Sequence, residues 1–503
     1  MRPSSSPSED QPPEDQRPED QPSEEQWPEE QRPEEQRPED RGSGGLLFGG
    51  LFGTAPVDAE LTDRAVLQAL LDVERALVEA AADEGVLPRA AAEAIGRECH
   101  AERFDPAALG RAAEAAGNPV VPLVHALTAA VPESARPWVH FGATSQDVLD
   151  TALLLVAVRA VVPLRRDLEG ALTAAARLAE QHRDTVMVAR TLGQQASPTT
   201  FGLKAANWLI ALLDTGVRLT EARHRLPVQL GGAAGTLAAL GPAGPAVADR
   251  LAGRLGLART PLPWHTRRQP LLDLGSALGA LIATTGKIAL DVGLLAQSEV
   301  AEVAEGGGPD RGGSSAMPHK RNPVGSILVT AASRRGPHLV ATLFSAAVQE
   351  HERAAGGWHA EWEPLLDLLR LAGGAAARTR VMLDGLLVRP DRMRANLTAT
   401  GGLVLAEAVA ARLAGALGRA AAHDAVARAV AESTQVGSRL TFRDALLSDP
   451  EIGARLGADE LDRALDPHRW LGSAGVLVDR AVARHRELGG ATGSATPPPE
   501  GTS

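Results

Sequence analysis

The side chains best suited to chemistry gather in a glycine-rich stretch, 305–324 (EGGGPDRGGSSAMPHKRNPV). They comprise two hydroxyls, three potential cations and an amide, namely Ser314, Ser315, His319, Lys320, Arg321 and Asn322. Such a set, joined by the backbone N–H groups of a turn, is typical of an anion pocket, and the preceding glycines suit a lid that opens and closes. Composition alone leaves a second interpretation equally open, a basic surface loop with flexible glycines.

Two further breaks interrupt an otherwise helical pattern. They are 139–147 (VHFGATSQD) and 190–202 (RTLGQQASPTTFG), both rich in hydroxyl and amide groups. Loops set between long helices are natural places for chemistry, because the helices hold them in position while the loop adapts.

The elements that must position these loops are helices. The stretch 61–84 is rich in Ala, Leu and Glu and is closed by Gly85, and from Leu164 onward apolar residues recur at three- and four-residue steps. After Pro270 a spacing near 3.5 predicts a helix running to Glu302 and spanning about 45–50 Å. Such a helix needs a bundle or an oligomer core to cover its apolar face. Strand patterns are scarce, so we expect a mainly α fold.

The composition excludes several classes of chemistry. The 503 residues contain no Tyr and one cysteine, Cys99, which excludes tyrosine catalysis, a disulfide framework and cysteine-based zinc or iron–sulfur sites. No apolar run reaches the length of a membrane span and no signal-peptide core opens the chain, so we expect a cytoplasmic protein.

The net charge of -12 is unevenly distributed. Residues 1–42 hold 14 acidic and 5 basic residues, which leaves 49 acidic against 46 basic residues for the rest of the chain. This segment repeats a five-residue unit such as DQRPE, with proline throughout. We interpret it as a disordered, solvating extension rather than an interaction tail, and 491–503 as a second disordered tail.

The stretch 313–323 (GSSAMPHKRNP) matches the signature of the fumarase/aspartase superfamily. In the same order, 142–147 (GATSQD) resembles the first signature region of that superfamily and 190–202 the second. The resemblance covers roughly residues 45–490. It implies three mainly helical domains, here 45–151, 152–394 and 395–490. It also implies that long central helices assemble into a homotetramer, with each active site built from loops of three subunits.

The resemblance also implies residue roles. The common chemistry moves a proton at a carbon next to a carboxylate, so cations and hydrogen-bond donors must lie at the developing charge. Ser314 takes the position of the lid serine that acts as acid and base, and Lys320 is the second predicted catalytic residue. The remaining matches are predicted substrate-binding residues, namely Thr144, Ser145, Gln194 and Asn322.

Three departures narrow the choice within the superfamily. Leu192 stands where adenylosuccinate lyases carry a histidine that transfers a proton, Asn118 where they carry another, and Ile327 where many members have Glu. The branch of 3-carboxy-cis,cis-muconate cycloisomerases also lacks the second-region histidine. Further stretches of the chain resemble that branch, at 116–123, 140–153, 263–266, 349–353 and 356–362.

The resemblance to this branch implies lactonisation of a muconate tricarboxylate in protocatechuate breakdown. In reverse, the leaving group is a tethered carboxylate, which departs as a stable anion, so Ser314 suffices as the one acid/base group. The substrate is a trianion, and we expect it to contact further cationic side chains, namely Arg268, His319 and Arg321. His140 is a further predicted substrate-binding residue beside the first region, and a role in orienting that loop through a hydrogen bond stays equally open. No metal or other cofactor is expected.

Two alternatives stay open. One is another lyase of the superfamily, acting on adenylosuccinate or a substituted succinate, which would need a proton donor near Leu192. The other is a non-catalytic structural protein, which the intact Ser314 and Lys320 disfavour. We expect no nucleic-acid or membrane partner. Four residues keep open roles, and the two histidines among them are too far apart in sequence for a standard metal pair: His351, Arg353, His359 and Glu361.

Overall fold

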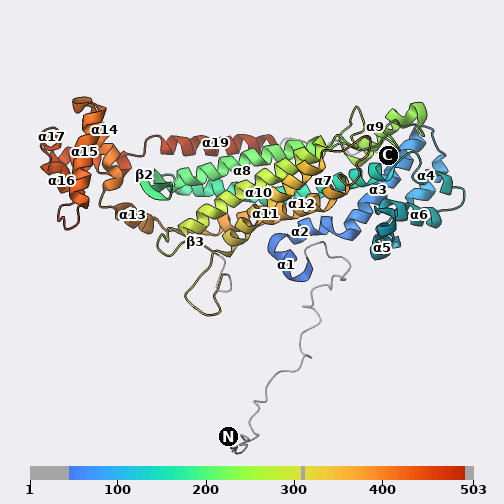
Figure 1. Ribbon diagram of the computed structural model, residues 1–503, viewed down its shortest axis with the longest axis horizontal. Helices are drawn as coiled ribbons and strands as arrows, with labels where there is room; N and C mark the ends of the chain where they lie inside the picture. Colours follow the sequence, from blue (N-terminus) through green and yellow to red (C-terminus); the bar gives the residue numbers. More distant parts are fainter. Residues whose placement is uncertain (1–44, 307–311, 493–503) are drawn as a thin grey trace, which may run out of the picture.

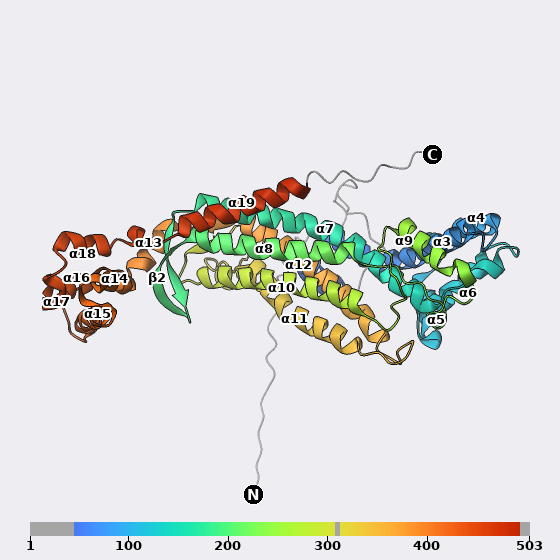
Figure 2. The ribbon, with the colours of Figure 1, turned by 90° about the horizontal axis from the view of Figure 1, so that it is seen from above.

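A computed structural model describes residues 45–306 and 312–492. The segments predicted to be disordered, 1–42 and 491–503, lie outside these residues, except that the last helix runs to Thr492. Figures 1 and 2 show an elongated molecule with a bundle of long helices in the middle and smaller helical groups at its two ends.

Five long helices form the bundle, and each packs against others of the set. They are α7 (Ser145–Gln181), α8 (Phe201–His224), α10 (Gln269–Leu295), α11 (Val324–Ala346) and α12 (Trp362–Asp384). The mainly α fold with a central long-helix bundle is therefore confirmed. The predicted domain boundary at 151 falls inside α7, and the division into domains stays a prediction.

Shorter helices gather at the end of the bundle where α7 begins, except that α1 (Gly45–Phe52) and α2 (Ala55–Asp58) lie alongside the bundle against α7, α11 and α12 (Figure 1). Their longest member, α3 (Asp63–Asp83), begins where the Thr62 hydroxyl accepts a hydrogen bond from the Ala65 N–H at 3.1 Å. It ends before Gly85, which has a positive φ of 69°. The others at this end are α4 (Arg89–Gly96), α5 (Pro106–Ala116), α6 (Val120–Ala130) and α9 (Gly244–Leu255).

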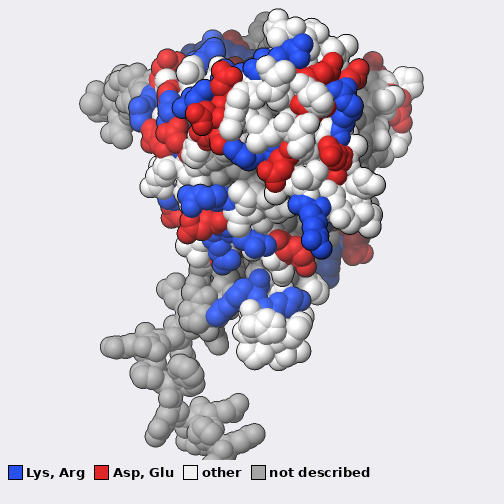
Figure 3. Space-filling view, turned by 90° about the vertical axis from the view of Figure 1, so that its left-hand side faces the viewer, with Lys and Arg blue, Asp and Glu red and all other residues white. Residues whose placement is uncertain are grey.

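The opposite end carries a small group with a hydrophobic core of its own, formed by residues such as Val409, Phe442 and Ile452. Acidic and basic side chains alternate over the face seen in Figure 3, in keeping with ion pairs such as Arg443 with Asp462. The helices are α13 (Pro390–Thr398), α14 (Ala406–Leu417), α15 (Arg419–Thr434), α16 (Phe442–Ser448), α17 (Pro450–Gly453) and α18 (Ala458–Ala464), and α19 (Ala474–Thr492) returns along the bundle.

Two short antiparallel pairs supply the strands of the described residues. β1 (Val186–Thr191) and β2 (Gln194–Thr200) form a hairpin, and β3 (Val303–Glu305) pairs with β4 (Leu386–Val388). The hairpin contains the second signature region, which the sequence predicted only as a break between helices.

The prediction that the helix after Pro270 runs to Glu302 is wrong. α10 ends at Leu295, and the chain then turns through Ala301, whose φ of 51° is incompatible with a continuing right-handed helix. α10 is also the one described helix that is long and apolar enough to cross a membrane by length and composition. It packs against α8, α11 and α12 within the bundle.

Candidate active site

The first signature region caps the N-terminus of α7, and Asp147 holds it in place. The Asp147 side chain is 1% exposed and accepts four hydrogen bonds. Its donors are the backbone N–H groups of Thr144 (3.0 Å), Gly231 (2.9 Å) and Gly232 (2.8 Å), and the Nε2 of His265 (2.6 Å). This carboxylate therefore fixes the backbone beside Thr144 and Ser145.

Two basic side chains, Arg353 and His140, flank this cap. The Arg353 guanidinium donates to the Thr144 Oγ1 at 3.0 Å and to the Ala233 carbonyl at 2.8 Å. The His140 Nδ1 lies 2.6 Å from the Glu74 Oε1. Burial lowers the pKa of His140, but the charge and hydrogen bond of Glu74, with a smaller contribution from Asp147, more than compensate, so this pKa lies above its usual value.

The second signature region is the tip of the β1–β2 hairpin. Leu192 and Gly193 form the two-residue turn, with φ values of 51° and 79°. The Leu192 side chain is fully exposed, and Gln194 is also exposed. An apolar side chain in a left-handed conformation is an uncommon choice for such a turn.

The third signature region closes on itself through Asn322. Its backbone N–H and its side-chain Nδ2 both donate to the Gly312 carbonyl, at 2.8 and 3.2 Å. The Ser314 Oγ accepts from the Met317 N–H at 3.2 Å, and the side chains of His319 and Lys320 are exposed, as is Arg321. Residues 307–311 lie outside the described residues.

Hydrogen bonds anchor both ends of this third loop. The Glu305 carboxylate accepts from the N–H groups of Gly325 (2.9 Å) and Ser326 (2.7 Å) at the start of α11. Glu302, which is fully buried, binds Arg190 of β1 through two hydrogen bonds of 2.7 and 2.9 Å. The second and third regions therefore lie at the same end of the bundle.

The first region lies at the other end. Thr144 stands at the start of α7, and the second region follows its end, so 37 residues of helix separate them, or about 55 Å at 1.5 Å per residue. Figures 1 and 2 agree, with β2 far from α3, against which the first region packs, and Figure 1 shows β3 far from α3 as well. One chain therefore does not bring the three regions together.

Arg268 corrects one prediction. Its side chain is 2% exposed and bound by two carboxylates, Asp150 at 2.7 and 3.0 Å and Glu361 at 2.7 to 3.1 Å. Its guanidinium also stacks on Trp264, 4.6 Å from the ring centroid. With its donors occupied inside the core, Arg268 holds together the starts of α7, α10 and α12 and is not a substrate ligand.

The stretches 349–353 and 356–362 extend this buried network. Burial and the nearby Asp150 charge raise the pKa of Glu361 to about 7, although Arg268 opposes the shift. The Trp358 indole donates to Asp150 at 2.9 Å, and the His359 Nε2 lies 3.0 Å from the Gly117 carbonyl. Among the described residues, no three His, Cys, Asp or Glu side chains gather as metal ligands.

Three residues that form hydrogen bonds around the first region escaped the sequence analysis: Glu74, Asp147 and His265. The helical pattern marks Glu74 only as one acidic residue among several on α3. Asp147 lies within the recognised first region, and its neighbour in space, His265, lies within the stretch 263–266. The pairing between them is visible only in three dimensions.

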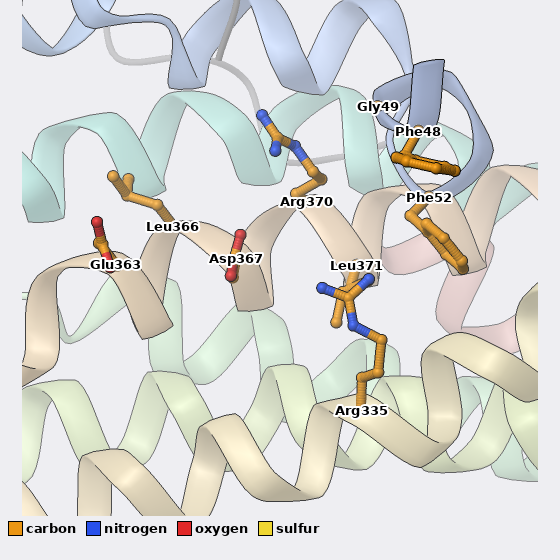
Figure 4. A pocket seen from close by; sticks show the side chains of 9 residues that line it. All are labelled: Phe48, Gly49, Phe52, Arg335, Glu363, Leu366, Asp367, Arg370 and Leu371. Carbon is orange, nitrogen blue, oxygen red and sulfur yellow. The ribbon is translucent and has the colours of Figure 1, made fainter. Parts of the chain in front are cut away.

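A pocket of about 530 Å³ lies elsewhere, where α1 meets α11 and α12 (Figure 4). The guanidinium of Arg335 stands over the Phe52 ring, 5.1 Å from its centroid, and Asp367 and Arg370 line the wall formed by α12. None of the predicted site residues lines this pocket, so it is not the candidate active site.

The fold and the three regions define a helical lyase, and comparisons with known proteins agree. The sequence model of the lyase family matches residues 54–335, and the model described as the adenylosuccinate lyase C-terminus matches 402–481. The chain belongs to this lyase family, within the fumarase/aspartase superfamily.

Two curated relatives and one solved structure are particularly similar. A 3-carboxy-cis,cis-muconate cycloisomerase of Pseudomonas aeruginosa is 47% identical, over 88% of this chain and 97% of its own. A nitrosuccinate lyase of Streptomyces davaonensis is 48% identical, over 85% and 92%. The 3-carboxy-cis,cis-muconate lactonizing enzyme of Pseudomonas putida superposes with a TM-score of 0.82 at 42% identity, over 88% of this chain and 100% of its own.

Proposed function

We propose that the protein is a cycloisomerase that converts 3-carboxy-cis,cis-muconate to 4-carboxymuconolactone. The observation that carries the proposal is the exposed Leu192 at the hairpin tip, in a chain that keeps Ser314 and Lys320. A reaction at this site proceeds without a proton donor at position 192, which suits a leaving group that departs as a stable anion.

The chemistry uses one acid/base group. A substrate carboxylate oxygen adds to the conjugated double bond, and Ser314 delivers a proton to the carbon next to another carboxylate. Lys320, with the amide of Asn322, stabilises the negative charge that develops there. Thr144 and Ser145 hold a carboxylate at the start of α7, Gln194 contributes from the hairpin tip, and no cofactor is needed.

We also propose a homotetramer with shared active sites. The separation of the first region from the other two supports this, since a site that needs all three must draw them from different copies. Large apolar side chains on α10 and α11 are about half exposed in the single chain, including Leu290 (52%) and Phe344 (50%). Contact with further copies would cover them. A cytoplasmic location, without nucleic-acid or membrane partners, stays a prediction.

A second candidate is the elimination of nitrite from nitrosuccinate, favoured by the relative that is 48% identical. Nitrite also departs as a stable anion, while Ser314 takes the proton from the adjacent carbon. Unlike the lyase alternative of the sequence analysis, this elimination from a substituted succinate needs no proton donor near Leu192.

One assay separates the candidates. Purified protein should remove the conjugated-diene absorbance of 3-carboxy-cis,cis-muconate and release no nitrite from nitrosuccinate. Nitrite release with an unchanged diene would favour the second candidate, and a folded protein inactive on both would refute both.

Ser314→Ala should abolish turnover while the assembly size, measured by light scattering, stays unchanged. Ser315→Ala, which removes the neighbouring hydroxyl, should keep much more activity. The opposite ranking would transfer the acid/base role to Ser315.

A further inference from the structure

The side chain of Glu74 is a buried carboxylate with a single hydrogen-bond partner. It lies in the middle of α3 and is fully buried. Its Oε1 lies 2.6 Å from the His140 Nδ1, while its Oε2 is buried and has no partner among the described residues. A carboxylate without a hydrogen-bonded Arg or Lys is costly to bury unless another cation compensates it.

His140 is the group that can compensate this charge. Because a carboxylate accepts hydrogen bonds, the Nδ1 must donate, which leaves the Nε2 as the unbound nitrogen of the ring. The side chain remains 18% exposed, and the residue holds a left-handed φ of 58° at the turn that leads to Gly142 and Thr144. A strained backbone of this kind persists where the surrounding contacts over-determine it.

The position of His140 relates it to the proposed reaction. It stands four residues before Thr144, whose hydroxyl accepts a hydrogen bond from Arg353 between α11 and α12. The charged groups that act on the His140 ring are Glu74 from α3 and Asp147 from α7, and both favour its protonated form. Asp147 is itself paired with His265. The Cys99 thiol beside Glu74 is neutral, because burial and the Glu74 charge raise its pKa.

We infer that Glu74 is a positioning residue that keeps His140 protonated, so that the His140 Nε2–H receives a carboxylate of the substrate. The inference rests on the proposed function, because it requires a polycarboxylate at the first signature region. Glu74 does not touch the substrate and acts through the ring of His140. The protonated His140 supplies the positive charge at the end of the bundle opposite to Lys320.

The expected signature is a pH dependence of KM. A histidine whose pKa is raised in the folded protein is charged below that pKa and loses its charge as the pH rises through it. In the wild type, KM for 3-carboxy-cis,cis-muconate should therefore stay low to above pH 6.5 and then rise, approaching about tenfold per pH unit. In Glu74→Gln the rise should begin at a lower pH, while kcat at pH 6 is kept.

The control is Glu79→Gln, the same substitution on the same helix at a carboxylate that pairs with Arg254 instead. It should reproduce the wild-type profile. A Glu74→Gln profile that coincides with the wild type would overturn the inference, since a merely structural role of Glu74 changes stability without moving the profile.

A second variant covers the case in which Glu74→Gln does not fold. His140→Gln keeps a hydrogen-bond donor for Glu74 but carries no charge at any pH, so KM should be raised and should lose the rise with pH that the titration of His140 causes in the wild type. A His140→Gln profile with the wild-type rise would show that another group titrates, and would also overturn the inference.

Failure of the proposed function would look different. If the wild type turns over neither substrate, the pKa of His140 in the ligand-free protein is still measurable from 13C-labelled histidine, with its resonance assigned by its loss in His140→Gln. We expect a value above 6.5 that falls in Glu74→Gln. An unshifted value would overturn the role of Glu74 independently of the reaction.

Discussion

Arginines of this chain serve two different purposes, and burial separates them. Arg353 is partly exposed, and its guanidinium donates a hydrogen bond to the Thr144 hydroxyl. Arg268 is buried, and Asp150 and Glu361 bind its guanidinium. The sequence predicted Arg268 as a substrate ligand and left the role of Arg353 open. Their roles differ because carboxylates of the chain itself already bind the guanidinium of Arg268, whereas no such carboxylate binds that of Arg353 among the hydrogen bonds described above.

Arg268→Met should therefore destabilise the fold. It leaves two carboxylates buried without their cation, which costs about 3–5 kcal/mol, and urea unfolding should show this loss. Arg268→Lys keeps the charge but loses the forked geometry, so we expect an intermediate loss. If Arg268 bound substrate instead, Arg268→Lys would raise KM while the unfolding midpoint stayed unchanged.

At the scale of elements, the β1–β2 hairpin combines an unfavourable turn residue with an exposed apolar side chain. Leu192 adopts a positive φ where Asn or Gly is favoured. An apolar residue is expected in such a conformation where its side chain has a function that outweighs the conformational strain of the turn. In the proposed tetramer, the hairpin tip reaches the active site of a neighbouring copy.

Leu192→Asn should relieve the turn and raise the free energy of unfolding by up to about 1 kcal/mol, measured by chemical denaturation. Turnover should nevertheless fall at least tenfold, because the apolar contact in the neighbouring site is lost. Leu192→Met, which keeps an apolar side chain, should retain most of the activity. Unchanged turnover in Leu192→Asn would exclude Leu192 from the site.

At the scale of the whole molecule, each active site of the proposed homotetramer is formed by several copies of the chain. The first region of one chain and the third region of the same chain lie at opposite ends of the bundle (Figure 1). Two inactive variants can therefore complement each other if their substitutions affect different regions.

Ser314→Ala and Thr144→Ala, each inactive alone, should regain activity when they are co-expressed. With random mixing, about a quarter of the sites draw both native residues from different copies, so turnover should approach a quarter of the wild-type value. Two variants that both carry substitutions in 314–322 should not recover. Failure of the first pair to complement would mean that the two regions act within one chain.

The sequence predicted the elements better than their interactions. The motif at 313–323, the helical periodicity and the distribution of charge sufficed for the fold and for the three loops. The end of α10 was misplaced, because apolar residues continue past Leu295 into a turn that only the backbone of Ala301 reveals. The partners Glu74 and His140 are 66 residues apart in sequence, and no local pattern marks a contact at that separation.

The length of α7 has a consequence of its own. In the proposed assembly, one end of this helix carries Thr144 into one active site, and the strand that follows its other end carries Leu192 into a different one. The length of the helix thus sets the distance between two catalytic centres. Inserting a single residue would turn its far end by about 100° and shift it by about 1.5 Å, which would misalign both centres at once.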